Sequence, residues 1–189
     1  MNIINVGYQS TNYYLLEIKG GKLMVDCGWP GTFTRFAAEF KRKGISPGEV
    51  KYILVTHFHP DHAGLVQEFK DLGAKLILME SQVGFVNSFA ESFTEKKVHY
   101  TEIKVDDNLV LKFKDSRKFL SDLGIAGEII STPGHSDDSV TLILDDGFAF
   151  TGDLHPQEMA TEEQRAATQK SWDEIHRHKI TRVFPGHGN

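Results

Sequence analysis

The 189-residue chain has one cysteine, no long hydrophobic run and fewer basic than acidic residues. A single thiol, Cys27, cannot form an intramolecular disulfide, and structural zinc sites built mainly from cysteine are disfavoured. No apolar stretch is long enough to span a bilayer, and the first residues lack the basic start and apolar core of a signal peptide. We therefore expect a cytoplasmic protein without a membrane-spanning segment, in which Cys27 is a small buried hydrophobic residue.

The low basic content argues against nucleic acid as a partner. The chain carries 26 acidic and 21 basic side chains, a formal net charge of −5. Proteins that bind polyanions usually present a basic stripe. The nearest candidate, Lys41-Arg42-Lys43, is explained by the dipole and by solvation at the end of a predicted helix. We expect a small-molecule substrate and no nucleic acid, and the oligomeric state stays open.

Histidine is where the sequence is rich. The segment Thr56-His57-Phe58-His59-Pro60-Asp61-His62 places three imidazoles and a carboxylate directly after an apolar run at residues 52–55. Neutral imidazole and ionised carboxylate are the usual ligands of zinc and similar ions. If the apolar run is a buried strand, these groups lie at its C-terminal end, where open α/β sheets bind ligands. His57 and His59 can share one ion, which leaves Asp61 and His62 for a second.

Three later segments repeat the same arrangement of a short strand, a turn residue and one ligand. His135 follows Thr132-Pro133-Gly134, Asp153 follows Thr151-Gly152, and His187 follows Pro185-Gly186. Glycine and proline allow the sharp turns that aim such side chains. A single histidine is more often a surface or core residue, but this repetition predicts one metal site assembled from distant parts of the chain.

The run His-x-His-x-Asp-His, followed by a separate His, Asp and His, resembles the signature of the metallo-β-lactamase superfamily of hydrolases. The family's early Asp-x-Gly turn also matches Asp26-Cys27-Gly28. The resemblance covers nearly the whole chain and specifies the superfamily, but not the substrate, because this scaffold supports several chemistries. It implies a four-layer αββα sandwich of two mixed β-sheets with outer helices and the metals at one edge.

The resemblance implies a dinuclear centre in which Asp153 bridges two divalent ions. Zinc is the expected metal, with manganese or iron as alternatives. Asp61 has a second implied role, since it can orient a metal-bound hydroxide that acts as the nucleophile. The implied ligands are His57, His59 and His135 for the first ion, and Asp61, His62 and His187 for the second.

Two further features have alternative interpretations. His155 precedes a proline that favours extended backbone, so its imidazole can face the metals and assist a leaving group, or it is a loop residue without a role. Where many relatives have Thr-Pro-Gly-Ser, this chain has Ser136-Asp137-Asp138-Ser139. These carboxylates either disfavour an anionic substrate or face solvent and cap a turn.

The resemblance also separates branches of the family. Drug-hydrolysing β-lactamases are exported and lack an aspartate at the Asp153 position, and flavodiiron proteins typically have glutamate where His59 stands. Glyoxalase II shares the ligands but adds a glutathione-binding domain that is not expected here. The first hypothesis is therefore a hydrolase of a small ester, thioester or lactone. The alternatives are a phosphodiesterase with the same centre, or a metal-dependent binding or regulatory module without turnover.

Alternating apolar runs and amphipathic segments predict an α/β fold, and no linker-like segment divides the chain, so one domain over residues 1–189 is expected. Phe85 and Phe89 are expected either in the core or in the substrate pocket, and His176 and His178 at the surface. The predicted strands are 2–6, 12–18, 22–26, 52–55, 75–79, 98–105, 109–113, 127–131, 139–144, 148–151 and 180–184, and the predicted helices are 34–43, 63–72, 81–93, 116–123 and 161–178.

Overall fold

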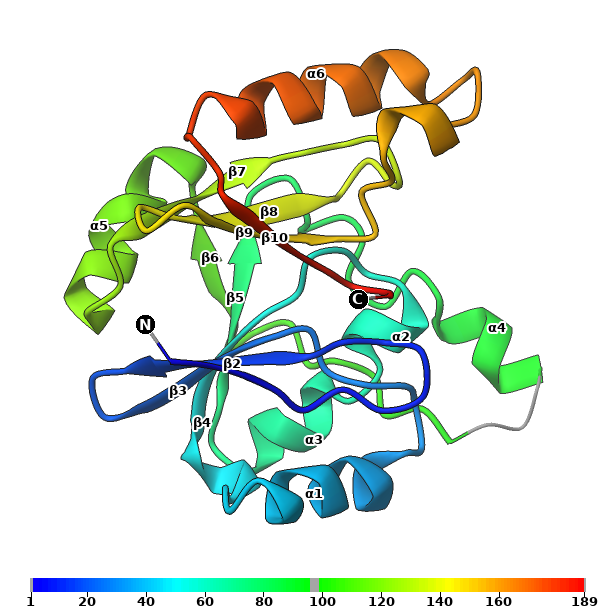
Figure 1. Ribbon diagram of the computed structural model, residues 1–189. Helices are drawn as coiled ribbons and strands as arrows, with labels where there is room; N and C mark the ends of the chain where they lie inside the picture. Colours follow the sequence, from blue (N-terminus) through cyan, green and yellow to red (C-terminus); the bar gives the residue numbers. More distant parts are fainter. Residues whose placement is uncertain (1, 96–98, 189) are drawn as a thin grey trace.

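The computed structural model describes residues 2–95 and 99–188, which form two β-sheets packed face to face (Figure 1). The first sheet has the order β1-β2-β3-β4-β5-β6. Its first three strands are antiparallel, and β3 to β6 are parallel. These strands are β1 (Ile3–Asn5), β2 (Tyr14–Ile18), β3 (Gly21–Val25), β4 (Val50–Leu54), β5 (Lys75–Met79) and β6 (Leu109–Leu111).

The second sheet has the order β10-β9-β8-β7. Its strands β7, β8 and β9 pair antiparallel, whereas β10 joins β9 in parallel. Both sheets are therefore mixed, as the αββα sandwich requires. Its strands are β7 (Gly127–Ser131), β8 (Val140–Leu144), β9 (Phe148–Gly152) and β10 (Arg182–Pro185).

Helices cover the outer faces of both sheets. In Figure 1, α1 and α3 lie below the first sheet and α6 lies above the second, while α5 packs beside β7. Among the described residues, no helix is both long and apolar enough to cross a membrane. The helices are α1 (Phe33–Arg42), α2 (Pro60–Ala63), α3 (Val66–Asp71), α4 (Ala90–Glu95), α5 (Phe113–Leu123) and α6 (Arg165–His176), with short 3-10 turns at Pro47–Glu49 and Gln157–Met159.

Three apolar layers hold the four structural layers together. Along β3 and β4, successive side chains alternate between faces: Met24 and Ile53 pack toward α1 and α3, whereas Val25 and Leu54 pack between the sheets. A third, smaller cluster joins the second sheet to α6 through Ile175. Because both faces of these strands are buried, their sequences are continuously apolar. Successive side chains alternate between the two faces, so each strand contributes to two apolar layers.

Several predicted elements are wrong between residues 63 and 113. The helix expected at 63–72 is divided into α2 and α3, because the Leu65 N–H donates to the Cys27 carbonyl at 3.0 Å and not to a carbonyl of the preceding turn. The helix expected at 81–93 is mostly turns, with Asn87 in the left-handed region at φ 65°. Only α4 follows. Val98 lies outside the described residues, and residues 99–105 form no strand, so β6 pairs with β5 instead.

Polar side chains hold the irregular segment at residues 99–108. The Asn87 amide donates to the Ile103 carbonyl at 3.0 Å and accepts from the Ile103 N–H at 2.8 Å. Lys70 Nζ donates to the Lys104 carbonyl at 2.5 Å and to Asp107 Oδ1 at 2.6 Å. These side-chain contacts take the place of the backbone hydrogen bonds that the predicted pair of strands would have formed. The local hydrophobic pattern does not predict them.

The aromatic cluster under the first sheet predicts a measurable loss of stability. Phe36 is fully buried, and its ring lies 5.2 Å from Phe40 and 5.6 Å from Phe69. Phe36→Ala should lower the free energy of unfolding by about 3–5 kcal/mol, because it removes buried surface and leaves a cavity. Urea denaturation measures this loss. The exposed Lys41→Ala on the same helix should change it by less than about 0.5 kcal/mol.

Candidate metal centre

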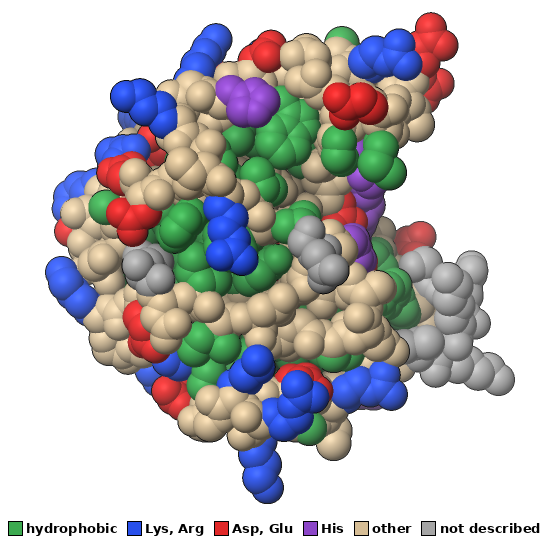
Figure 2. All heavy atoms as spheres, viewed as in Figure 1, with side chains coloured by type: hydrophobic (Ala, Val, Ile, Leu, Met, Phe, Trp, Pro, Cys, Tyr) green, Lys and Arg blue, Asp and Glu red, His purple; other side chains and the backbone are tan. Residues whose placement is uncertain are grey.

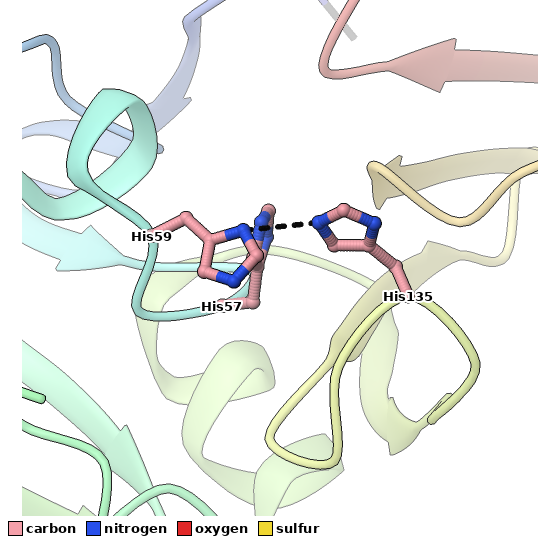
Figure 3. Close-up of side chains that lie close together, drawn as sticks. All are labelled: His57, His59 and His135. Carbon is pink, nitrogen blue, oxygen red and sulfur yellow. Dashed lines mark hydrogen bonds between the residues drawn. The ribbon is translucent and has the colours of Figure 1, made fainter. Parts of the chain in front are cut away.

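Three imidazoles meet where the two sheets come together at one edge. His57 and His59 lie on the loop after β4, and His135 lies on the loop between β7 and β8 (Figure 3). His59 Nδ1 lies 3.0 Å from His135 Nε2, and the ligand atoms of all three lie within 4.8 Å of one another. His59 and His135 are 76 residues apart in the sequence. The fold thus forms the first predicted triad from one loop of each sheet.

A second group lies beside the first. Asp61 and His62 belong to α2, and His187 follows β10. His187 Nε2 lies 3.1 Å from Asp61 Oδ2, and His62 Nε2 lies 3.5 Å from the same oxygen. These three ligand atoms also lie within 4.8 Å of one another. This group matches the second predicted triad.

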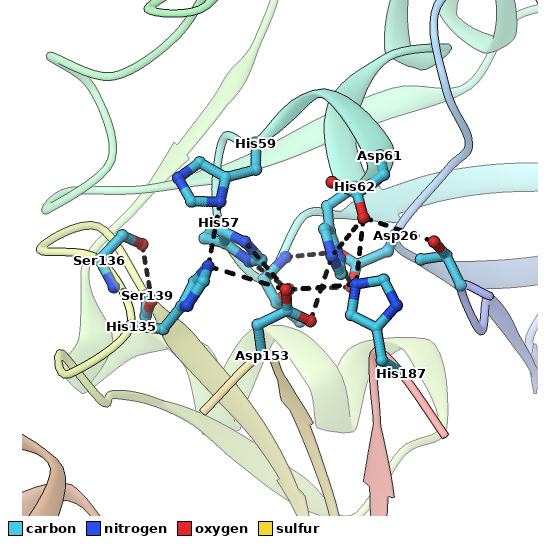
Figure 4. Close-up of polar contacts among 12 residues, drawn as sticks. Asp26, His57, His59, Asp61, His62, His135, Ser136, Ser139, Asp153 and His187 are labelled. Carbon is cyan, nitrogen blue, oxygen red and sulfur yellow. Dashed lines mark hydrogen bonds and ion pairs between the residues drawn. The ribbon is translucent and has the colours of Figure 1, made fainter. Parts of the chain in front are cut away.

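Asp153, directly after β9, lies between the two groups (Figure 4). Its Oδ2 lies 4.0 Å from His57 Nε2 and 3.7 Å from His135 Nε2. On the other side, Oδ1 lies 3.2 Å from His62 Nε2, and Oδ2 lies 3.3 Å from His187 Nε2. A carboxylate in this position can share its oxygens between two cations.

Two glycines let the strand ends approach this closely. Gly152 has φ 54°, and a Cβ there would lie 2.3 Å from Thr56 Oγ1. At Gly186, a Cβ would lie 2.5 Å from Asp153 Oδ1 and 2.7 Å from His62 Cε1. Any side chain at Gly186 would therefore enter the space between the ligands, which explains why a glycine precedes the ligand His187.

Asp26, after β3, orients ligands of both groups. Its Oδ2 accepts hydrogen bonds from Thr56 Oγ1 and from His62 Nδ1, both at 2.9 Å, and its Oδ1 accepts from the Thr56 N–H at 2.7 Å. Because the Thr56 hydroxyl hydrogen points to Asp26, His57 Nδ1 donates to Thr56 Oγ1 at 3.2 Å. Both imidazoles then present Nε2 to the centre. The family resemblance matched the turn at Asp26 but did not predict that its side chain orients the ligands.

The N-terminal segment holds His187. The carbonyl of Ser10 accepts from His187 Nδ1 at 2.7 Å, which again directs Nε2 toward the centre. The Asn12 side chain donates to the carbonyls of Pro185 at 3.1 Å and Gly188 at 2.8 Å. These residues were missed by the sequence reasoning, because the contacts join positions more than 170 residues apart and no local motif marks them.

The donor set fits divalent metal ions. Among the described residues, the buried atoms His57 Nε2, His62 Nε2 and Asp153 Oδ1 form no hydrogen bond of acceptable geometry, although the last two lie 3.2 Å apart. Buried polar atoms are nearly always paired, so three unpaired atoms aimed at one space indicate a missing ligand. Imidazole nitrogens and carboxylate oxygens suit zinc, manganese and iron. These atoms therefore support the predicted use of the residues as ligands.

The charges at the centre favour a cation. Burial lowers the pKa of His57 well below its usual value, which keeps that imidazole neutral. Burial acts in the same direction on His62, but Asp26, Asp153 and Asp61 outweigh it and raise the pKa of His62 well above its usual value. Burial raises the pKa of Asp61, yet the contact with His62 lowers it to about 2. Asp61 is therefore ionised at neutral pH and attracts positive charge.

A cavity of about 440 Å³ opens beside His59 and His135. Phe58 and Phe85 contribute apolar surface to it, and Asp137 and Glu163 are its exposed acidic side chains. Phe85 lines this cavity and also packs against the core, to which Phe89 belongs; a role in substrate binding stays a prediction. In Figure 2, histidine side chains reach the surface at the right edge, between the two halves of the molecule.

His155 lies at the edge of the centre. Its ring is perpendicular to that of His135, with centroids 5.4 Å apart, and its carbonyl accepts a hydrogen bond from Trp172 Nε1 at 2.8 Å. A small cavity of about 110 Å³ lies between His155, Asp153 and His187. The structure thus places His155 near the predicted ligands, and its role stays a prediction.

Other predicted residues take different positions. Cys27 is fully buried, as predicted, and burial raises the pKa of its thiol. His176 is exposed and His178 lies near Glu128, so both are surface residues. Asp138 does not face solvent, so that alternative is wrong for this residue: it is 2% exposed and accepts the Phe58 N–H at 2.6 Å, at the wall of the cavity beside His59.

Comparison with known proteins agrees with the fold and the site. A model of the metallo-beta-lactamase superfamily matches residues 6–187, and the chain therefore belongs to this superfamily. The beta-lactamase-like protein 2 homolog of Drosophila melanogaster is 30% identical over 185 residues, which cover 96% of this chain and 59% of that protein. A probable metallo-hydrolase of Methanocaldococcus jannaschii is 26% identical over 150 residues, 78% of this chain and 68% of that protein. The chain spans less than two thirds of the Drosophila relative's length.

Solved structures confirm the αββα architecture. A metallo-beta-lactamase family protein from Thermus thermophilus superposes with a TM-score of 0.76 at 23% identity, covering all of this chain and 73% of the other. The FEZ-1 metallo-beta-lactamase from Legionella gormanii superposes with a TM-score of 0.72 at 19% identity, covering 98% and 76%. At these identities the likeness concerns the fold alone.

The hydrogen bonds of Asp26 predict that a substitution at this residue, which is not a predicted ligand, changes metal affinity. In Asp26→Asn, an amide N–H facing His62 Nδ1 would favour the tautomer that carries hydrogen on Nε2, which blocks that ligand atom. We expect zinc affinity, measured by competition with a chromogenic chelator, to fall roughly 10–100-fold. The exposed Asp122→Asn should bind as the wild type does. An unchanged affinity in Asp26→Asn would contradict the orienting role.

Proposed function

We propose that the protein is a hydrolase that uses two divalent metal ions, zinc in the first instance, to cleave a small ester, thioester or lactone. The observation that carries the proposal is the pair of ligand triads with Asp153 between them, His57-His59-His135 and Asp61-His62-His187. Seven ligand atoms exceed what one tetrahedral ion uses. The M. jannaschii relative is named a probable metallo-hydrolase, which supports the same class of reaction.

Each part of the centre has a distinct task in this proposal. Bound divalent ions lower the pKa of water and stabilise the negative charge that develops on an attacked carbonyl oxygen. Asp61 combines a ligand position with the ability to accept a hydrogen bond from the attacking water. His155, beside His135, is placed to contact the leaving group. Asp26 and Ser10 keep the imidazoles oriented.

The cavity beside His59 supports acyl substrates over phosphodiesters. Of the described residues that line it, none is lysine or arginine, and Asp137 and Glu163 are exposed at it. A phosphodiester would bring negative charge toward these carboxylates, whereas an ester, thioester or lactone is neutral at the reacting group. The Phe58 and Phe85 surfaces suit an apolar acyl or leaving group. Binding of such a molecule without turnover is the remaining alternative.

A substrate panel tests the proposed class. Metal-replete protein should hydrolyse thioesters, lactones or p-nitrophenyl esters with a higher kcat/KM than bis-p-nitrophenyl phosphate. His57→Ala, prepared in parallel, should lose at least about 100-fold of the acyl activity, which excludes a contaminating esterase. A clear preference for the phosphodiester would overturn the acyl assignment. No turnover of any substrate by protein with full metal content would favour the binding module.

Removal of Asp153 tests the dinuclear arrangement. Wild-type protein purified without chelator should hold about two ions per chain by elemental analysis, because the two triads share one bridging carboxylate. Asp153→Ala should lower both metal content and turnover, since it removes the carboxylate between the two cations that offsets their repulsion. Asp61→Asn, which leaves the three imidazoles of the first triad, should keep one ion bound. Two retained ions and full activity in Asp153→Ala would contradict the bridging role.

A further inference from the structure

The first triad depends on the distance between two loops of different sheets. His57 and His59 follow β4 of the first sheet, and His135 lies between β7 and β8 of the second. The sheets are joined by apolar side chains, which are not directional and do not determine this distance to a fraction of an ångström. Directional contacts between the two loops must set it. Those contacts converge on Asp138 and its immediate neighbours.

Asp138 contacts the loop that carries the other two ligands. Its buried carboxylate accepts the Phe58 N–H at 2.6 Å, and Phe58 lies between His57 and His59 in the sequence. Asp138 itself is three residues after His135. A short, directional hydrogen bond of this kind can fix the distance between the two loops. One side chain thus joins the backbone between two ligands to the loop of the third.

The backbone at Asp138 is held from a second direction. The amide of Gln82, a fully buried residue after β5, donates to the Asp138 carbonyl at 3.2 Å and to the Val55 carbonyl at 2.9 Å. Nearby, the Val140 N–H donates to the Thr56 carbonyl at 2.8 Å. The Asp138 carboxylate extends this set of contacts to the residue between the ligands, which the other contacts do not reach.

We propose that Asp138 is a positioning residue of the first metal site, which sets the spacing of His57 and His59 relative to His135. The inference rests on the proposed function only in that the three imidazoles bind a divalent ion. Without the carboxylate, the buried Phe58 N–H would lack its acceptor, and the loop would move to satisfy it. The neighbouring Asp137 is exposed and is the matched control.

Metal titration of four variants tests this role without any substrate. Cobalt or zinc binding is measured by competition with a chromogenic chelator, and His135→Ala identifies the binding event of the first triad. Asp138→Ala should weaken this event roughly 10–100-fold, the usual effect of removing a group that orients metal ligands. Asp138→Asn keeps an acceptor oxygen and should retain most of the affinity. Asp137→Ala should bind as the wild type does.

The possible results separate positioning from other effects. Wild-type affinity in Asp138→Ala would overturn the proposal. Equal losses in Asp137→Ala and Asp138→Ala, or in the Asn and Ala variants of Asp138, would show that negative charge near the site matters, not the bond to Phe58. If Asp138→Ala weakened metal binding equally at the first and second triads and also lowered the Tm of the metal-free protein, the variant would have a general folding defect. That result would overturn the proposal. A wild type that binds no metal refutes the proposed function as well, whereas an inactive but metal-binding wild type refutes that function alone.

Discussion

The arrangement of the centre depends on the buried carboxylate of Asp26, which is not itself one of the predicted metal ligands. Asp26 accepts hydrogen bonds from Thr56 and from His62, and through the Thr56 hydroxyl it also determines which nitrogen of His57 faces the site. Each triad contains one of these two imidazoles. Asp26 adopts a left-handed backbone conformation, φ 60°, that is uncommon for a residue with a side chain. The turn after β3 thus has an energetic cost that the hydrogen bonds to Thr56 and His62 offset.

The two-sheet architecture explains why the ligands come from distant segments. The loops after β4, β7, β9 and β10 all open at the same edge of the sandwich, and each carries part of the centre. The interior between the sheets is apolar, with Leu54, Phe150 and Phe184 packed together there. A rigid apolar interior behind the ligands limits their movement, and glycines at 152 and 186 let the polar side chains approach one another.

The charge of the ligands favours metal binding, and the lining of the adjacent cavity favours neutral substrates. Asp61 and Asp153 lie among the predicted ligands, and the contact with His62 lowers the pKa of both carboxyls despite their burial, so both carry negative charge. Divalent ions neutralise this charge, so metal binding and the stability of these loops are coupled. The adjacent cavity is apolar on one side and acidic at its exposed residues, which favours neutral acyl groups over anionic ones.

Much of this protein was readable from local sequence. Apolar periodicity located most strands within two residues, and the seven predicted ligands all lie at the centre, because each follows a strand in a turn whose glycine, proline or threonine marks it. Tertiary structure alone decided the rest. Whether residues 63–72 form one helix depended on the hydrogen bond from the Leu65 N–H to the Cys27 carbonyl, and the path of residues 99–108 depended on Asn87 and Lys70. The roles of Asp26, Ser10 and Asp138 arise from hydrogen bonds between residues 30 to 177 positions apart, and no local pattern encodes such distances.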